Sequence, residues 1–270
     1  MPHIKLTLAY DGTAYHGSQI QPGVPTIQGE IEKALTEVRA FSTRTVFAGR
    51  TDAGVHAVGQ VVSTSVTWER SLDRLRGSLN ALLPRDIRVL GIESAPPGFN
   101  ARYDARSRAY RYRAVFGAEV IPPMLERYAW RVVGEIDHEL AGRAAARFIG
   151  RHNFGSFASA GRSQELPPEE LTREVLNCEW RRMEGALFPP GDAGELWELR
   201  IEATGFLPQM VRNIMAAIIA VASGKESLEW LEYLLVSGDR RLLGAPAPPH
   251  GLVLWHVRYD QSSAVQANMN

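Results

Sequence analysis

Apolar residues recur along this chain with two different periods, and segments of the two kinds alternate. Residues 3–10, HIKLTLAY, are apolar at every second position, which predicts a strand. Residues 27–40, IQGEIEKALTEVRA, are apolar at helical spacing and follow Thr26, a residue type that caps helix N-termini. Residues 57–66 and 86–95 again predict strands, with a helix over 71–83 between them. The first half of the chain therefore predicts alternating strands and helices.

The second half has the same mixture and follows a loop at residues 116–128 that contains paired prolines. Asp137 is the predicted N-cap of a helix that stops at Gly150, and residues 172–183 and 196–204 predict paired strands. An apolar helix over 208–224 and a closing strand over 252–259 follow. We expect an α+β fold with helices on antiparallel sheet. The loop predicts domains at 1–116 and 117–260, and the polar residues 261–270 predict a flexible tail.

Composition excludes several classes of function. Thirty basic residues balance thirty acidic ones, so any nucleic acid or anionic membrane must be bound by local patches. The single cysteine, Cys178, excludes an internal disulfide and a cysteine-rich zinc site, and the seven histidines are not at metal-ligand spacing. No apolar run reaches about 18 residues and no phosphate-binding glycine loop occurs. We expect a cytoplasmic protein without metal, membrane segment or nucleotide hydrolysis.

Residues 48–57, AGRTDAGVHA, place an arginine and an aspartate two positions apart between glycines. Glycine and aspartate are turn formers, so this stretch could simply connect RTVF and QVVS in a hairpin. Alternatively, the cluster of charge and backbone freedom belongs to a functional site. The stretch alone does not decide between these interpretations.

Residues 102–113, RYDARSRAYRYR, contain five arginines and one aspartate. In a strand, Arg108, Tyr110 and Tyr112 share one face, and Arg111 and Arg113 lie on the other. The arginines could contact phosphates while a tyrosine stacks on a base. A solvated edge strand, with arginine stems covering tyrosine rings, is the alternative.

Arg212 lies early in the predicted helix over 208–224, whose other positions are mostly apolar. A cation at a helix N-terminus gains nothing from the helix dipole, and a buried one needs a partner. A carboxylate from elsewhere in the fold would supply that partner and would be kept ionised by it. Alternatively, Arg212 simply reaches solvent.

Taken together, these segments resemble the TruA-type tRNA pseudouridine synthases. The motifs cover nearly the whole chain and occur in the family's order. They are YDGTAYHGSQIQ, TIQGEIEKAL, GRTDAGVHAVGQVV, FNARYDARSRAYRYR, GRHNFGSFASAG, FLPQMVRNIM and APPHGLVLWHVRYD.

The resemblance implies an isomerase that moves uracil from an N1 to a C5 glycosidic link in tRNA, at positions 38, 39 and 40, without a cofactor. It implies that Asp52 is the catalytic aspartate, that Arg212 pairs with it, and that Tyr110 stacks on the uracil and relays the C5 proton. Arg50 would fill the space left by the extruded nucleotide. The remaining arginines of the strand motif would hold backbone phosphates: Arg102, Arg106, Arg108, Arg111 and Arg113.

The family's architecture is two similar α+β domains with joined sheets and a basic cleft, usually in a homodimer. Several positions depart from the family's pattern and lie at expected RNA or dimer contacts: Ser18, Ala109, Asn153 and Ala158. Two other functions fit parts of the pattern. An RNA-binding module would leave Asp52 unexplained, because a carboxylate repels phosphates. A glycosidic hydrolase would need a second carboxylate, which the motifs lack.

Overall fold

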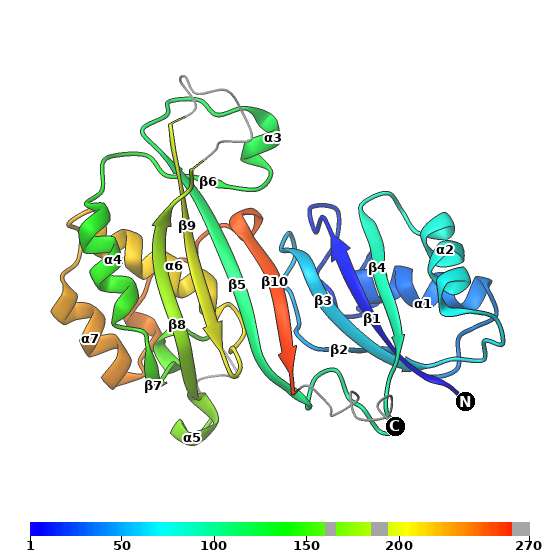
Figure 1. Ribbon diagram of the computed structural model, residues 1–270. Helices are drawn as coiled ribbons and strands as arrows, with labels where there is room; N and C mark the ends of the chain where they lie inside the picture. Colours follow the sequence, from blue (N-terminus) through cyan, green and yellow to red (C-terminus); the bar gives the residue numbers. More distant parts are fainter. Residues whose placement is uncertain (160–165, 185–193, 261–270) are drawn as a thin grey trace, which may run out of the picture.

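One mostly antiparallel sheet extends through the whole molecule. The computed structural model describes residues 1–159, 166–184 and 194–260. Within these residues the sheet has ten strands, in the order β4-β1-β3-β10-β5-β9-β8-β7, with β2 paired to β3 and β6 paired to β5. Figure 1 shows this sheet with helices at both of its ends.

The N-terminal part of the sheet is built from residues 3–94. Its elements are β1 (His3–Tyr10), α1 (Ile27–Glu37), β2 (Val46–Phe47), β3 (His56–Ser65), α2 (Leu72–Leu82) and β4 (Ile87–Ser94). The Thr26 side chain accepts a hydrogen bond from the Gly29 N–H, which confirms the predicted cap of α1.

The remaining part begins with a long strand, β5. The elements are β5 (Ala105–Phe116), α3 (Pro123–Glu126), β6 (Trp130–Arg131), α4 (His138–Ala146), β7 (Gly150–Asn153), α5 (Pro168–Leu171), β8 (Thr172–Arg182), β9 (Glu195–Ala203), α6 (Met210–Ala222), α7 (Leu228–Ser237) and β10 (Leu252–Tyr259). Asp137 caps α4 as predicted.

The C-terminal strand β10 lies between the two parts of the sheet (Figure 1). It pairs antiparallel with β5 over most of its length and parallel with β3 at Val253↔His56 and Leu254↔Ala57. These two parallel pairs connect the strands of residues 3–94 to the rest of the sheet. The junction therefore depends on the last strand of the chain.

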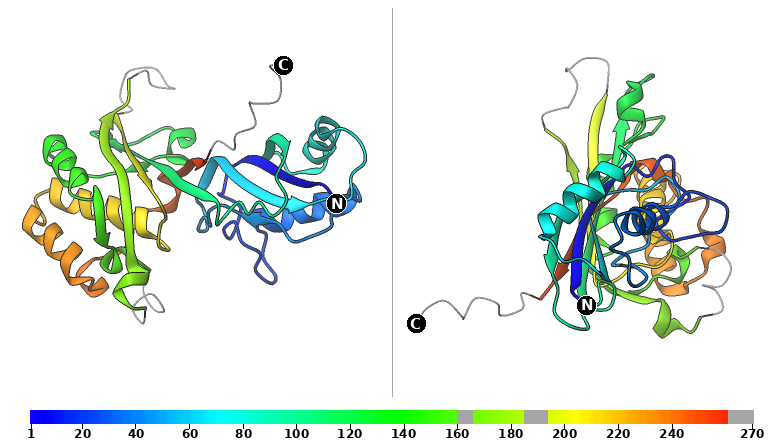
Figure 2. Two further views of the ribbon diagram at one scale, coloured as in Figure 1. Left: turned by 60° about the horizontal axis from the view of Figure 1, so that its bottom comes forward. Right: turned by 90° about the vertical axis from the view of Figure 1, so that its right-hand side faces the viewer.

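Helices α1, α6 and α7 lie on the same side of the sheet (Figure 2). Alternate residues of the strands point to this side, among them Leu8, Tyr110 and Leu254, and they share one apolar core with the helices. We call this side the helix face. Residues between them, such as Arg111, point to the opposite side, the open face.

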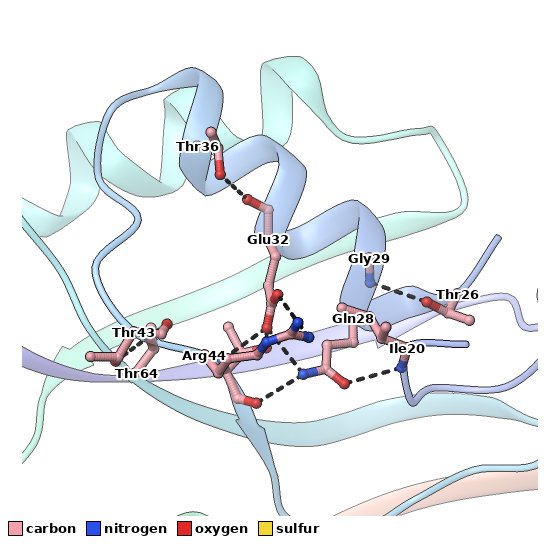
Figure 3. A network of polar contacts seen from close by, with 10 residues as sticks. Ile20, Thr26, Gln28, Gly29, Glu32, Thr36, Thr43, Arg44 and Thr64 are labelled. Atoms are coloured by element: carbon pink, nitrogen blue, oxygen red, sulfur yellow. Dashed lines mark hydrogen bonds and ion pairs between the residues drawn. The ribbon is translucent and has the colours of Figure 1, made fainter. Parts of the chain in front are cut away.

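A polar network fixes the segment that leads into β2 (Figure 3). The Glu32 carboxylate on α1 accepts hydrogen bonds from the Thr45 N–H at 3.0 Å, the Thr45 hydroxyl at 2.9 Å and the Gln28 amide at 3.0 Å. Gln28 also donates to the Thr45 carbonyl at 3.1 Å. Thr45 lies directly before β2, and the loop that contains Asp52 begins directly after β2 ends at Phe47. Helix α1 therefore holds the short strand from which this loop starts.

The predicted mixed fold with a largely antiparallel sheet and flanking helices is confirmed. The division into domains at residue 116, the likeness of the two domains and a basic cleft stay predictions. Strand β5, which ends at that boundary, pairs with β9 and β10. The tail predicted over residues 261–270 lies outside the described residues.

Leu254 is fully buried at the junction, opposite both Ala57 and Tyr110. We expect Leu254→Ala to leave a cavity there and to lower the free energy of unfolding by about 2–5 kcal/mol. Urea denaturation measures this as a lower midpoint. The matched control is Val236→Ala on α7, where the side chain is 81% exposed and the expected change is within about 0.5 kcal/mol. Equal effects of the two substitutions would contradict the role of β10 as the junction.

Candidate active site

The loop over residues 48–55 connects β2 to β3, which pair antiparallel. The hairpin interpretation is therefore correct as a description of the backbone. The buried Gln60 side chain donates to the Gly49 carbonyl at 2.7 Å and accepts from the Gly49 N–H at 3.2 Å. Both main-chain groups of Gly49 are thus held by one amide, and the first half of the loop has one fixed conformation.

Thr51, directly before Asp52, is held from the other side of the loop. Its N–H donates to the Ser18 hydroxyl at 2.9 Å, and its carbonyl accepts from the Ser18 N–H at 3.0 Å. Its hydroxyl hydrogen bonds to the Tyr10 hydroxyl at 2.8 Å. Ser18 is 1% exposed, so this departure from the family's pattern supports the loop from inside the protein.

Close approach of other segments explains two glycines. Gly17 has φ +94°, and a Cβ there would lie 2.8 Å from the Thr51 carbonyl oxygen. Gly54 has φ +78°, and a Cβ there would lie 3.0 Å from the Pro249 ring. A side chain at Gly17 would displace the loop beside Asp52.

Asp52 and Arg212 meet, although they lie 160 residues apart in the chain. Arg212 Nη1 lies 3.4 Å from Asp52 Oδ2. The guanidinium is 13% exposed and the carboxylate is 37% exposed. The positive partner is thus largely buried while the carboxylate remains accessible to a ligand. The carboxylate that the helix position of Arg212 required is Asp52.

Residues 244–251, which we call the proline strap, connect this pair to the sheet. The Ala247 carbonyl accepts from Arg212 Nε at 2.7 Å, and the Pro248 carbonyl accepts from the Tyr112 hydroxyl at 2.6 Å. The next residues contact the Asp52 loop, with Pro249 against Gly54. The strap therefore orients Arg212 and supports the Asp52 loop.

Tyr110 lies on the helix face and is 7% exposed. Its ring packs edge to face on Phe206, with centroids 5.0 Å apart. Its hydroxyl is beside the Asp52 loop, because a Cβ on Gly49 would lie 3.5 Å from that oxygen. Burial raises the pKa of Tyr110, and the nearby Tyr10 raises it further. The Tyr110 hydroxyl therefore keeps its proton at neutral pH. Tyr112 is fully buried and belongs to the core.

The structure places the predicted RNA-binding arginines in different surroundings. Arg50 is exposed, and no hydrogen bond or ion pair joins it to another residue that the structure describes. Arg102 is exposed and lies over the Tyr103 ring, with its guanidinium carbon 5.6 Å from the centroid. Arg106 is paired with Asp260. Arg108 donates to main-chain carbonyls, among them Ala48.

Arg111 is not brought to Asp52. It lies on the open face, where its guanidinium carbon is 3.5 Å from the centroid of the Trp255 ring. The fully buried Glu198 carboxylate is within 3.4 Å of Arg111 and 3.2 Å of Arg113, and it accepts from Arg200 at 2.8 Å. Burial lowers the pKa of Arg111, and Glu198 opposes that shift. Arg111 and Tyr110 thus face opposite sides of the sheet.

Sequence reasoning missed Gln60, which holds the loop, and Ala247, which holds Arg212, and it placed Ser18 at an RNA or dimer contact although Ser18 is buried under the loop. Gln60, Ser18 and Ala247 act through amide, hydroxyl and main-chain groups, which carry no charge pattern. Only Gln60 could have been noticed in the sequence, because it is the only amide side chain in strand β3. The other departures have local structural roles: Asn153 accepts from the Gly155 N–H, and Ala158 is buried.

Two surface cavities, one beside His138 and one beside Tyr103, contain none of Asp52, Tyr110 and Arg212. Within residues 1–159, 166–184 and 194–260, no group of three or more histidine, cysteine and acidic residues could hold a metal ion. In the same ranges, none of the helices has the length and apolar character needed to span a membrane.

The arrangement combines an accessible carboxylate, a fixed guanidinium and a protonated phenol. A carboxylate held this way can act as a nucleophile or a base, while a protonated phenol beside it can carry a proton. The loop that presents the carboxylate is held by hydrogen bonds with Gln60 and Ser18. A reacting group that is held in position in this way lowers the entropic cost of a reaction.

Comparisons with known proteins match the chain over nearly its whole length. A family model described as tRNA pseudouridine synthase matches residues 7–104 and 144–260. tRNA pseudouridine synthase A of Geobacillus sp. (strain WCH70) is 36% identical over 258 residues, which cover 95% of this chain and 98% of the relative. The protein of that name from Coxiella burnetii (strain Dugway 5J108-111) is 36% identical over 259 residues, which cover 96% and 94%. Among solved structures, a Cbf5-Nop10-Gar1 complex matches with a TM-score of 0.32 and 11% identity, covering 89% of this chain and 60% of that chain.

His56 follows the Asp52 loop and is 3% exposed. The Gly12 N–H donates to its Nδ1 at 3.0 Å, Asp11 Oδ1 lies 3.1 Å from the same Nδ1, and its Nε2 lies 3.1 Å from the His250 carbonyl oxygen. Burial lowers the pKa of His56, and the nearby Asp11 carboxylate opposes this only in part. The unfolded chain therefore takes up this proton at a higher pH than the folded protein does.

We expect acid to destabilise the protein through His56. As pH falls below about 6.5, the ordinary value for histidine, the unfolded state gains a proton that folded His56 lacks, and the free energy of unfolding decreases. His56→Gln should make this decrease between pH 7 and pH 5 shallower, by up to about 1.4 kcal/mol per pH unit. Urea denaturation at a series of pH values measures both slopes. Equal slopes in the wild type and in His56→Gln would contradict this prediction, because they would show that His56 has the same pKa in the folded and the unfolded state.

Proposed function

The chain belongs to the tRNA pseudouridine synthase family, whose members are isomerases, and we propose that it converts uridine to pseudouridine at positions 38, 39 and 40 of the tRNA anticodon stem-loop. The observation that carries this proposal is the contact of Asp52 with Arg212, with the Tyr110 hydroxyl beside Gly49 of the loop that contains Asp52. These three residues come from three distant motifs of the family resemblance. The chemistry needs a carboxylate at the sugar or base and a carrier for one proton.

We propose that Asp52 is the nucleophile. In the isomerisation the bond from C1′ to N1 breaks and a bond from C1′ to C5 forms, while C5 loses a proton and N1 gains one. An ionised carboxylate can form a transient bond to the substrate while the base turns. Arg212, fixed by the Ala247 carbonyl, lies against the carboxylate and keeps it oriented. The 37% exposure of Asp52 leaves room for the approach of the substrate.

Tyr110 is proposed to stack on the uracil and to relay the C5 proton. Its position beside Gly49 supports this role. Because the raised pKa keeps the hydroxyl protonated, its oxygen takes up the C5 proton as it passes its own proton on toward N1, which gains one in the reaction. Phe206 holds the ring in place.

Arg50 is proposed to occupy the space of the extruded nucleotide. It is exposed, and it lies two residues before Asp52 on the same loop. Extrusion costs a few kcal/mol, and least where the nucleotide is in a loop or at a stem end, which suits an anticodon arm. Of the strand-motif arginines, exposed Arg102 is the one we propose for phosphate contact. Arg106 is paired with Asp260 and Arg111 with Glu198, so both would have to break an ion pair before they could bind a phosphate.

We also propose that the protein works in the cytoplasm, as a homodimer of chains that each contain the two domains described above. This proposal rests on the family resemblance. Light scattering of the purified protein tests the dimer, and a monomer at micromolar concentration would contradict it.

We expect Asp52→Asn to abolish isomerisation while tRNA affinity stays within several-fold, because the amide keeps the shape of the side chain and loses its charge. Pseudouridine in a uridine-containing tRNA transcript is measured and mapped to its position. The control is Asp73→Asn on α2, whose side chain is 86% exposed. Turnover by Asp52→Asn would refute the assignment of the nucleophile. Free uracil from the wild type would indicate a hydrolase, and binding without any product would indicate an RNA-binding module.

We expect Tyr110→Phe to lower the single-turnover rate by about 10²-fold or more with little change in tRNA affinity. The ring and its packing on Phe206 remain, whereas the proton carrier is lost. Rate and affinity are measured on the same transcript, with Tyr233→Phe, 58% exposed on α7, as the control. An unchanged rate would leave Tyr110 only a stacking role.

A further inference from the structure

Among the arginines of residues 102–113, which we call the β5 motif, Arg108 is the one whose hydrogen-bonding groups are all used by contacts within the described residues. A guanidinium has five N–H donors. Arg108 Nε and Nη2 both donate to the Ala48 carbonyl, at 3.1 and 2.9 Å. Nη1 donates to the carbonyls of Ala105 and Thr204, each at 3.1 Å, and Nη2 also donates to the Arg102 carbonyl. Five hydrogen bonds use five donors, so none is left for a phosphate.

The carbonyls that Arg108 binds come from segments that form the candidate site. Ala48 is 2% exposed and begins the loop that presents Asp52. Thr204 follows β9 and lies two residues before Phe206, the ring that packs on Tyr110. Arg108 itself is two residues before Tyr110 on the same face of β5. One side chain therefore connects the Asp52 loop, the Tyr110 strand and the Phe206 segment.

A lysine could not replace these contacts. Its ammonium is a point charge on one nitrogen, whereas the planar guanidinium reaches carbonyls on several sides at once. Withdrawing Arg108 toward solvent would also leave the carbonyl of the buried Ala48 without these two donors. Burial lowers the pKa of Arg108, as expected for a cation surrounded by main chain.

We propose that Arg108 is a positioning residue that holds the Asp52 loop against the Tyr110 strand, and that it does not bind RNA phosphate. The inference rests on the proposed role of Asp52, because the loop matters for rate only if it presents a catalytic group. Displacement of a reacting group by about 1 Å can cost about 10²-fold in rate. Loss of Arg108 should therefore appear in the chemical step and leave tRNA binding nearly unchanged.

The test uses Arg108→Lys, which keeps the charge, and Arg108→Gln, which removes it. We measure the single-turnover rate of pseudouridine formation at saturating enzyme, and tRNA affinity over a series of salt concentrations. Both variants should lower the rate at least 10-fold, keep the affinity within about 3-fold, and leave the slope of log affinity against log salt unchanged. A phosphate ligand behaves differently: Arg108→Gln would then reduce that slope by about 0.7–0.9.

The matched control is Arg88→Lys. Arg88 on β4 also donates to main-chain carbonyls, those of Pro84 and Ile87, but it has no contact with the site. Thermal melting of all three variants shows the loss of stability, and Arg88→Lys should keep the wild-type rate. If Arg108→Gln does not fold, the lysine variant decides alone.

Three outcomes would overturn the inference: a wild-type rate in Arg108→Lys, a reduced salt slope in Arg108→Gln, or an equal loss of rate in Arg88→Lys. Failure of the proposed function looks different, since the wild-type protein would then form no pseudouridine at all. If the wild type is active, each of these measurements either supports or contradicts the positioning role of Arg108.

Discussion

The contact between the Asp52 carboxylate and the Arg212 guanidinium is the interaction on which the site depends. At 3.4 Å, and with the carboxylate 37% exposed, this pair contributes little to stability by itself. It cannot bring together two segments that lie 160 residues apart. The geometry of the pair must therefore be imposed by the rest of the fold. Neutral main-chain contacts on both sides do this, with Gln60 and Ser18 holding the loop and Ala247 holding the guanidinium.

Strand β10 makes that geometry possible. It joins β3 and β5, so that the strand following the Asp52 loop and the strand carrying Tyr110 lie one strand apart. The proline strap immediately precedes β10 and contacts Arg212, Tyr112 and Gly54. The last strand thus connects the sheet and also places the residues that approach Asp52. The joining of the two parts of the sheet and the assembly of the site therefore both depend on the strap and β10.

Local patterns predicted most of the elements, because each long strand or helix has its own period and caps. The Thr26 and Asp137 caps, the divided face of β5 and the need of Arg212 for a carboxylate are confirmed. Helix α7 was missed although Ser227 caps it and Gly238 ends it. Strands β2 and β6 have two residues each, too few to show a period. The position of β10 depends on pairing between distant strands, which no local pattern contains.

The arginines of the β5 motif show why the site was harder to predict than the fold. A guanidinium offers the same donors to a phosphate, a carboxylate or a main-chain carbonyl, so the sequence alone cannot distinguish these partners. In the structure Arg108 binds carbonyls, Arg111 and Arg113 surround Glu198, and Arg106 pairs with Asp260. Arg102 alone among the five makes neither a carbonyl nor a carboxylate contact with its side chain in the described residues. Of the five, Arg108 is the arginine that contacts the loop of Asp52 in the described residues, through the Ala48 carbonyl.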